Sequence, residues 1–144
     1  MAGGGNPPRP IRTVTEMTMN RQILVVDDSE IVLEVARDTL EEAGFEVATA
    51  TCASEVDSHI TATGKPALII MDVMLPGISG DKKTWALKHN SSTSSIPVLL
   101  LSSKSEEDLV RLVRESGADG YIRKPFTEGE MIAAVGKILN ESKA

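Results

Sequence analysis

The stretch ILVVDDSE, residues 23–30, decides how the rest of the chain can fold. Its four consecutive apolar residues are typical of a strand buried on both faces, as in the centre of a parallel sheet. Two adjacent acids, Asp27 and Asp28, follow this strand directly. Because carboxylates lose their hydration inside a core, we expect both to lie beyond the strand, at the carboxyl edge of the sheet.

The alternation of a short apolar run with a longer amphipathic run recurs along the chain. Strands are predicted over residues 23–26, 46–50, 67–71, 98–101 and 121–123. Helices are predicted over residues 30–43, 53–63, 79–89, 106–116 and 127–139. Strands that alternate with helices require right-handed crossovers. The expected fold is therefore a single α/β domain with a doubly wound, five-stranded parallel sheet and five helices.

Two of the predicted helices carry informative apolar patterns. The helix over residues 30–43 is expected to place on one face Val32, Val35, Ala36, Thr39 and Ala43. The helix over residues 106–116 has more apolar residues than one buried stripe needs, namely Leu109, Val110, Leu112 and Val113. Of these, Val110 is expected to face outward and meet a partner.

Composition and charge exclude several classes of protein. The chain has 144 residues and a net charge of −6, whereas a surface for duplex nucleic acid needs clustered Lys and Arg. No apolar run approaches the roughly 20 residues of a membrane span. Cys52 is the only cysteine, which excludes an internal disulfide and favours a reducing compartment. We expect a cytoplasmic protein that binds neither nucleic acid nor membrane.

The two ends of the chain differ in character from its middle. Residues 1–20 are rich in Gly, Pro, Thr and Met without periodicity, which predicts a flexible N-terminal tail. The predicted domain spans residues 21–140, and residues 141–144 are predicted to be a C-terminal tail. Because few residues follow the last helix, we expect no DNA-binding or enzymatic module on this chain. Output then passes through protein contacts, or the chain is a fragment of a longer protein.

Polar side chains gather where the predicted strands end. Ligands of such sheets bind beyond the carboxyl ends of the strands, where the chain places Asp27, Asp28, Asp72, Ser102 and Lys124. Three converging carboxylates repel unless a cation neutralises them, and Mg²⁺ binds one or two carboxylates together with water and phosphate oxygens. A carboxylate can also be the nucleophile toward a phosphoryl group, whose charge a metal ion and a lysine offset.

Each of these residues also has a simpler interpretation. Asp27 or Asp28 alone would be expected to cap the first helix, a role that Ser29 could also fill, and Asp72 alone to form a turn. A single lysine such as Lys124 more often lies on the surface, and Ser102 could cap a turn. Their joint occurrence, in order and each at the end of a predicted strand, favours a functional site.

From about residue 21 to residue 139 the chain resembles the receiver domain of bacterial two-component response regulators, and it looks most like the stand-alone kind used in chemotaxis. The resemblance rests on the pair Asp27-Asp28, on Asp72 in IIMDVMLPGISG, on Ser102 in VLLLSS, on Tyr121 in GADGYIRKPF, and on Lys124-Pro125. It implies the flavodoxin-like version of the predicted fold.

The resemblance implies a metal site and a phosphoacceptor. Asp72 would accept the phosphoryl group. Asp28, Asp72 and the backbone carbonyl of Met74 would bind Mg²⁺ directly, and Asp27 would act mostly through bound water. Met74 occupies a position that varies in the family and tunes the lifetime of the phosphoryl group.

The resemblance also implies how the phosphoryl group is sensed. Lys124 and Ser102 would each contact a phosphoryl oxygen, and the bond from Lys124 to Pro125 would be cis. Tyr121 would change rotamer in response. Ser102 replaces the threonine that is commoner in the family.

The function implied is a signalling switch, phosphorylated by a histidine kinase or a phosphotransfer protein, with no catalysis beyond its own phosphorylation and dephosphorylation. The face of the fourth helix, fifth strand and fifth helix is expected to meet a downstream protein, with a homodimer as the alternative.

Two other functions stay open. An Mg²⁺-dependent phosphatase with an aspartate nucleophile would place its acids as D-x-D and need a cap. A pseudo-receiver scaffold would commonly lack an acid or the lysine.

Overall fold

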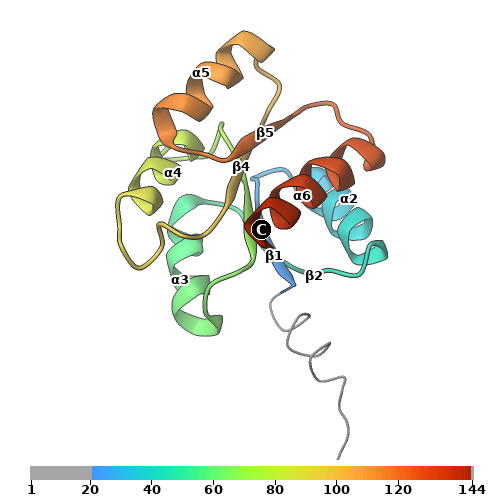
Figure 1. Ribbon diagram of the computed structural model, residues 1–144, viewed down its shortest axis with the longest axis horizontal. Helices are drawn as coiled ribbons and strands as arrows, with labels where there is room; N and C mark the ends of the chain where they lie inside the picture. The colour runs from blue at the N-terminus through green and yellow to red at the C-terminus, as the bar shows by residue number, and fades with distance from the viewer. Residues whose placement is uncertain (1–20, 144) are drawn as a thin grey trace, which may run out of the picture.

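The computed structural model describes residues 21–143 (Figure 1). The predicted N-terminal tail, residues 1–20, lies outside this described part. In chain order the elements are β1 (Gln22–Val26), α2 (Glu30–Glu42), β2 (Glu46–Ala50), α3 (Ala53–Thr63), β3 (Leu68–Asp72), α4 (Gly80–Lys88), β4 (Val98–Ser102), α5 (Glu106–Ser116), β5 (Gly120–Arg123) and α6 (Glu128–Lys143).

The strands form one parallel sheet in the order β2-β1-β3-β4-β5. Every residue of β3 and β4 is buried, as their continuous apolar runs predicted. The chain reverses its direction of winding at β1, which has β2 on one side and β3 on the other. The doubly wound α/β fold is confirmed, and the carboxyl ends of β1 and β3 meet at its switch point, where such sheets bind ligands.

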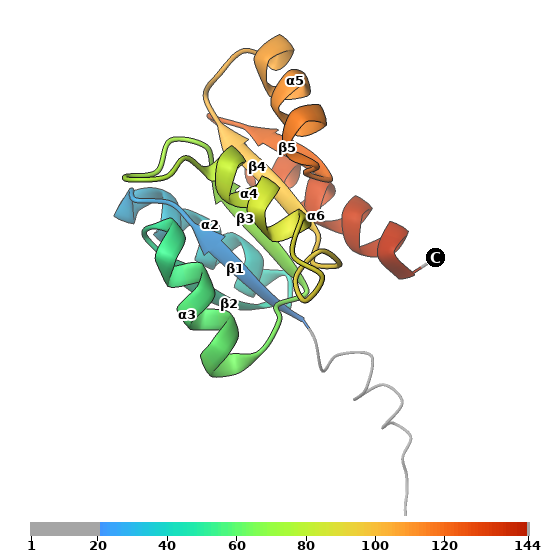
Figure 2. The ribbon, with the colours of Figure 1, turned by 90° about the vertical axis from the view of Figure 1, so that its left-hand side faces the viewer.

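Helices cover both faces of the sheet and create two apolar cores (Figures 1 and 2). Ile23 and Val25 of β1 pack in the core under α2 and α6, whereas Leu24 and Val26 pack in the core under α3, α4 and α5. The alternation follows from the two-residue period of a strand. Burial on both sides explains why β3 and β4 carry no polar residue before their carboxyl ends, and why β1 is apolar after its first residue, Gln22.

Helix α2 buries a different face from the predicted one. Its buried residues are Leu33, Ala36, Thr39 and Leu40. Val35, which was placed on the buried face, is 43% exposed, and Ala43 is the exposed residue that ends the helix. The larger side chains of Leu33 and Leu40 reach the core shared with α6, and they set the rotation of the helix.

Strands β3 and β4 each run one residue further than predicted. Asp72 and Ser102 are therefore the last residues of their strands, and not the first residues of the following loops. Main-chain hydrogen bonds continue past both: Val73 N donates to Leu101 O at 3.0 Å, and Lys124 N donates to Ser102 O at 2.8 Å. The sheet itself thus fixes where these two side chains begin.

Helix α6 continues through residues 141–143, which the sequence assigned to a C-terminal tail. The difference has a simple reason, because no glycine or proline follows Gly136 to stop the helix. Within residues 21–143, no helix combines the length and the apolar character needed to cross a bilayer.

Candidate functional site

Asp27 is held at the end of β1 by the backbone around it. Its own amide donates to Ala50 O of β2 at 3.0 Å, and its Oδ1 accepts a hydrogen bond from the Ser29 amide at 2.9 Å. Ser29 in turn caps α2, since its hydroxyl oxygen accepts from the Val32 amide at 3.3 Å. The acid pair therefore lies between a strand end and a helix start. Of the three residues considered for the cap, Asp27, Asp28 and Ser29, it is Ser29 that fills the role.

The three predicted acids come together at this edge. One carboxylate oxygen from each of Asp27, Asp28 and Asp72 lies within 4.8 Å of the others. Asp27 and Asp72 are buried, whereas Asp28 is exposed at the mouth of the cluster. The cluster therefore has two fixed acids at its base and one acid that solvent, or an incoming group, reaches first.

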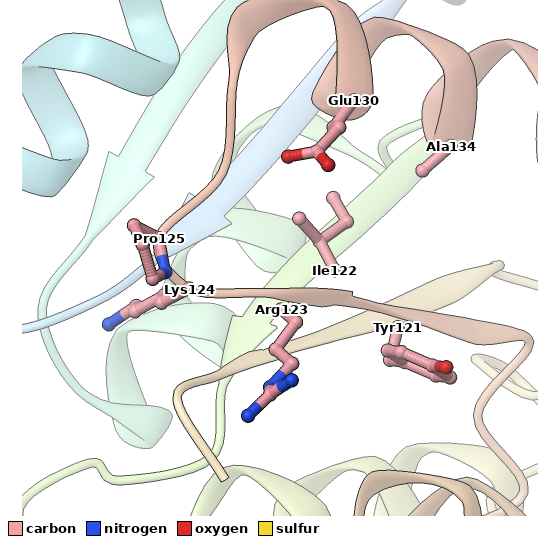
Figure 3. A pocket seen from close by; sticks show the side chains of 7 residues that line it. All are labelled: Tyr121, Ile122, Arg123, Lys124, Pro125, Glu130 and Ala134. Atoms are coloured by element: carbon pink, nitrogen blue, oxygen red, sulfur yellow. The ribbon is translucent and has the colours of Figure 1, made fainter. Parts of the chain in front are cut away.

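Lys124 brings a positive charge to the same place. Its Nζ lies 3.0 Å from Asp27 Oδ2 and 3.5 Å from Asp72 Oδ1. Figure 3 shows this side chain leaving the end of β5 and pointing away from Glu130 and Tyr121. The peptide bond from Lys124 to Pro125 is cis. The lysine is thus an internal partner of the acids and not a free surface residue.

The negative charge of the three acids is only partly neutralised by Lys124. Burial, together with the nearby charge of Asp27, raises the pKa of Asp72 to about 6, although Lys124 and the Met74 amide act in the opposite direction. Burial alone would lower the pKa of Lys124. Its close contacts with the two acids and their negative charges outweigh that effect, so the pKa of Lys124 is raised.

The donor set suits a divalent cation. Three carboxylates and one ammonium leave an excess of two negative charges when all are ionised. Asp27 Oδ2 is buried and close enough to Lys124 for an ion pair, but it makes no hydrogen bond of good geometry among the described residues. Oxygen ligands of this kind, with one acid open to solvent, are what Mg²⁺ uses in proteins.

Ser102 and Met74 lie beside the cluster. Ser102 is buried, and its hydroxyl oxygen accepts a hydrogen bond from the Lys104 amide at 3.0 Å, a bond that does not use the hydroxyl proton. The Met74 amide donates to Asp72 Oδ1 at 3.3 Å, while its side chain is 64% exposed. The loop after β3 therefore folds back onto the carboxylate of Asp72.

Tyr121 points away from the acids. Its hydroxyl donates to Glu106 Oε2 at 2.9 Å, and this bond raises the pKa of Tyr121. Arg123, two residues along β5, donates from Nε to Lys104 O at 3.0 Å. Figure 3 shows Tyr121 and Arg123 on one side of β5 and Ile122 on the other. Sequence reasoning singled out Tyr121 but missed Glu106 and Arg123, which look like ordinary surface charges.

Gly80, at the start of α4, was also missed. Its amide donates to Val73 O at 2.9 Å, which closes the loop after β3. A methyl group added here would overlap the carbonyl oxygen of Asp72 and lie 2.8 Å from its carbonyl carbon. The only sequence signal was a glycine just after the PGIS turn, at the expected start of a helix.

Three acids, a buried hydroxyl and a lysine at one sheet edge can bind a metal ion and a phosphoryl group. The chain also matches the model of the response regulator receiver domain over residues 23–136. It belongs to that family. Phosphorylation on an aspartate and Mg²⁺ binding are typical of receiver domains in two-component systems.

Two full-length regulators show how far the similarity of this receiver domain extends. It is 37% identical over 124 residues to the phosphate regulon transcriptional regulatory protein PhoB of Pseudomonas aeruginosa, covering 86% of this chain and 54% of the relative. It is 39% identical over 125 residues to the alkaline phosphatase synthesis transcriptional regulatory protein PhoP of Bacillus subtilis, covering 87% and 51%. The chain thus spans about half the length of these curated relatives.

The receiver domain also resembles solved structures. Chemotaxis response regulator CheY4 of Vibrio cholerae superimposes with a TM-score of 0.75 at 26% identity, covering 81% of this chain and 97% of that one. The similarity therefore includes both a single-domain chemotaxis protein and the receiver halves of longer transcriptional regulators.

Proposed function

We propose that this receiver domain is a phosphoacceptor switch in which Asp72 takes a phosphoryl group from a histidine kinase or a phosphotransfer protein. One observation carries the proposal: Lys124 and the carboxylates of Asp27 and Asp28 surround Asp72 within a single cluster. The modified domain then signals through protein contacts. It catalyses no reaction beyond its own phosphorylation and dephosphorylation.

The chemistry follows from the position of each side chain. An ionised oxygen of Asp72 attacks the phosphorus of a donor phosphohistidine, so that a P–O bond forms while the P–N bond breaks and the imidazole keeps the electron pair. Lys124 offsets charge on the phosphoryl oxygens. Bound Mg²⁺, held by Asp28, Asp72, the Met74 carbonyl and more remotely Asp27, would supply further charge stabilisation.

The raised pKa of Asp72 bears on this chemistry. Only the ionised carboxylate is a nucleophile, and with a pKa of about 6 the group is ionised at neutral pH but not in mild acid. Binding of a cation to the cluster favours the ionised form still further. The site is therefore reactive under neutral conditions and most reactive when Mg²⁺ is present.

The arrangement favours a switch over the two alternative functions. A pseudo-receiver scaffold would not need all three acids and the lysine to converge. A phosphatase of the aspartate-nucleophile class uses acids in a D-x-D order, but here Asp27 and Asp28 are adjacent and have different environments, one buried and one exposed. Neither alternative has a specific observation in its favour.

The partners and location belong to the same proposal. Output is expected through the face of α5, β5 and α6, where Val110 is 42% exposed as its helical position predicted. A downstream protein is the proposed occupant of that face, and a homodimer is the alternative. A cytoplasmic location is proposed as well, in keeping with the single free cysteine, Cys52.

Incubation with acetyl phosphate and Mg²⁺ is expected to add one phosphoryl group per chain, measured by intact mass. The Mg²⁺ concentration that gives half the maximal rate should rise at least about tenfold in Asp28→Asn, because Mg²⁺ has few protein ligands to lose. The rise should be smaller in Asp27→Asn, since Ser29 and Lys124 already engage both oxygens of that acid.

The control for this experiment is Asp38→Asn, which removes an exposed acid on α2 outside the cluster. It should behave as the unmodified protein does. Absence of any phosphoryl group in the unmodified protein would contradict the switch, and an unchanged Mg²⁺ requirement in Asp28→Asn would contradict the metal site.

A further inference from the structure

The turn after β4 is fastened to the edge strand β5 by two side chains. Tyr121 reaches Glu106, the first residue of α5, with its hydroxyl 2.9 Å from Glu106 Oε2. Arg123 reaches the backbone of the same turn, with its Nε 3.0 Å from Lys104 O. We call these two hydrogen bonds, from Tyr121 to Glu106 and from Arg123 to Lys104, the β5 clasp.

The clasp lies next to the hydroxyl that would sense the phosphoryl group. Arg123 is the direct neighbour of Ser102 in the parallel ladder between β4 and β5. The Lys104 amide donates to the Ser102 hydroxyl, while the carbonyl of the same residue accepts from Arg123. Residue 104 is therefore held from both sides, by Ser102 through its amide and by Arg123 through its carbonyl.

Any movement of Ser102 toward Asp72 must strain this arrangement. The strand backbones are held by the ladder, as in the bond from Lys124 N to Ser102 O, so the turn is the part that can shift. A turn that follows the Ser102 hydroxyl carries Lys104 and Glu106 away from Arg123 and Tyr121. Tyr121 in turn cannot rotate inward while its hydroxyl stays bound to Glu106.

We propose that the β5 clasp holds the resting conformation, so that Glu106 and Arg123 set how readily phosphorylation switches the domain. This rests on the proposed function of Asp72. A bond present only in the resting conformation lowers the population of the switched conformation. It lowers by the same factor the affinity of every ligand that binds only the switched conformation. Removing the clasp therefore makes the switch easier.

Beryllofluoride, a mimic of the phosphoryl group, tests the clasp on the full chain. Beryllofluoride is titrated into the protein in the presence of Mg²⁺, and its binding is followed by fluorine NMR. The variants Glu106→Ala and Arg123→Met should each bind beryllofluoride about three- to tenfold more tightly than the unmodified protein. A merely structural role for these residues would leave the affinity unchanged or weaken it. Tyr121→Phe should bind beryllofluoride as tightly as Glu106→Ala does, because both changes remove the same hydrogen bond. The double variant Tyr121→Phe/Glu106→Ala should therefore bind little more tightly than either single variant.

The matched control is Glu107→Ala, which removes the neighbouring exposed acid of α5 and should leave the affinity unchanged. The clasp is refuted if Glu106→Ala and Arg123→Met bind beryllofluoride no more tightly than the unmodified protein does, while the phosphoacceptor proposal survives that result. Failure of the unmodified protein to bind the mimic would instead overturn the proposed function, and the clasp with it.

Discussion

Gly80→Ala is expected to lower the free energy of unfolding by about 3 kcal/mol, near the upper end of the usual range for overpacking. The added methyl group would overlap the backbone carbonyl of Asp72 and lie 2.9 Å from the Met71 side chain. A flexible side chain could move aside, but the carbonyl belongs to a strand in the centre of the sheet. The loop after β3 must then shift away from Asp72, so the rate of phosphorylation should fall together with stability.

Urea unfolding measures this effect, and Gly136→Ala is its matched control. Gly136 lies within α6, and a methyl group added there meets nothing within 4 Å. The control should be neutral or stabilise the protein by about 0.5–1 kcal/mol, the usual gain from replacing a helical glycine. If Gly80→Ala unfolds at the same urea concentration as the unmodified protein, the close packing of Gly80 on Asp72 does not contribute to the free energy of unfolding.

Asp72→Asn is expected to stabilise the folded protein at pH 7.5 without Mg²⁺ by roughly 2–3 kcal/mol. Burial raises the folded-state pKa of Asp72 from 3.8 to about 6, so the folded protein prefers the protonated acid. Stability from this group is fully present below the unfolded pKa and is lost as pH rises through about 6. Asparagine never ionises and never incurs this loss.

The pH dependence distinguishes this effect from a general change in packing. The gain in Asp72→Asn should shrink toward zero as the pH approaches 4, where Asp72 is itself protonated. Mg²⁺ should stabilise the unmodified protein and narrow the gap at pH 7.5. The exposed Asp28, changed to Asn, provides the comparison and should gain less. If Asp72→Asn is no more stable than the unmodified protein at pH 7.5, then burial and the charge of Asp27 do not destabilise the ionised form of Asp72.

The strands and the acid cluster could be predicted because their signals are local. A run such as residues 23–26 is apolar throughout only where both faces of a strand are covered, and the polar residues that end such runs mark one edge of the sheet. Once the strands are parallel, Asp27, Asp72 and Lys124 all lie at the same edge of the sheet. The edge that carries the site therefore follows from topology, whereas the contacts of Lys124 with the acids depend on the reach of its side chain across β4.

The remaining features depend on contacts that sequence spacing does not show. The rotation of α2 was wrong because Val35 and Leu33 are both apolar, and only the core shared with α6 selects Leu33. Glu106 and Arg123 lie far apart in sequence from their partners and have no periodic signature. Gly80 matters through its distance to one carbonyl group, which no local pattern encodes.

The most direct test of the central claim is to locate the acyl phosphate itself. Protein treated with acetyl phosphate and Mg²⁺ is reduced with borohydride, which converts an aspartyl phosphate into homoserine, and peptide mass spectrometry then identifies the converted residue. The proposed function predicts conversion at Asp72 and no conversion in Asp72→Asn. Conversion at Asp27 or Asp28 with Asp72 intact, or labelling of Asp72→Asn at the original rate, would contradict it.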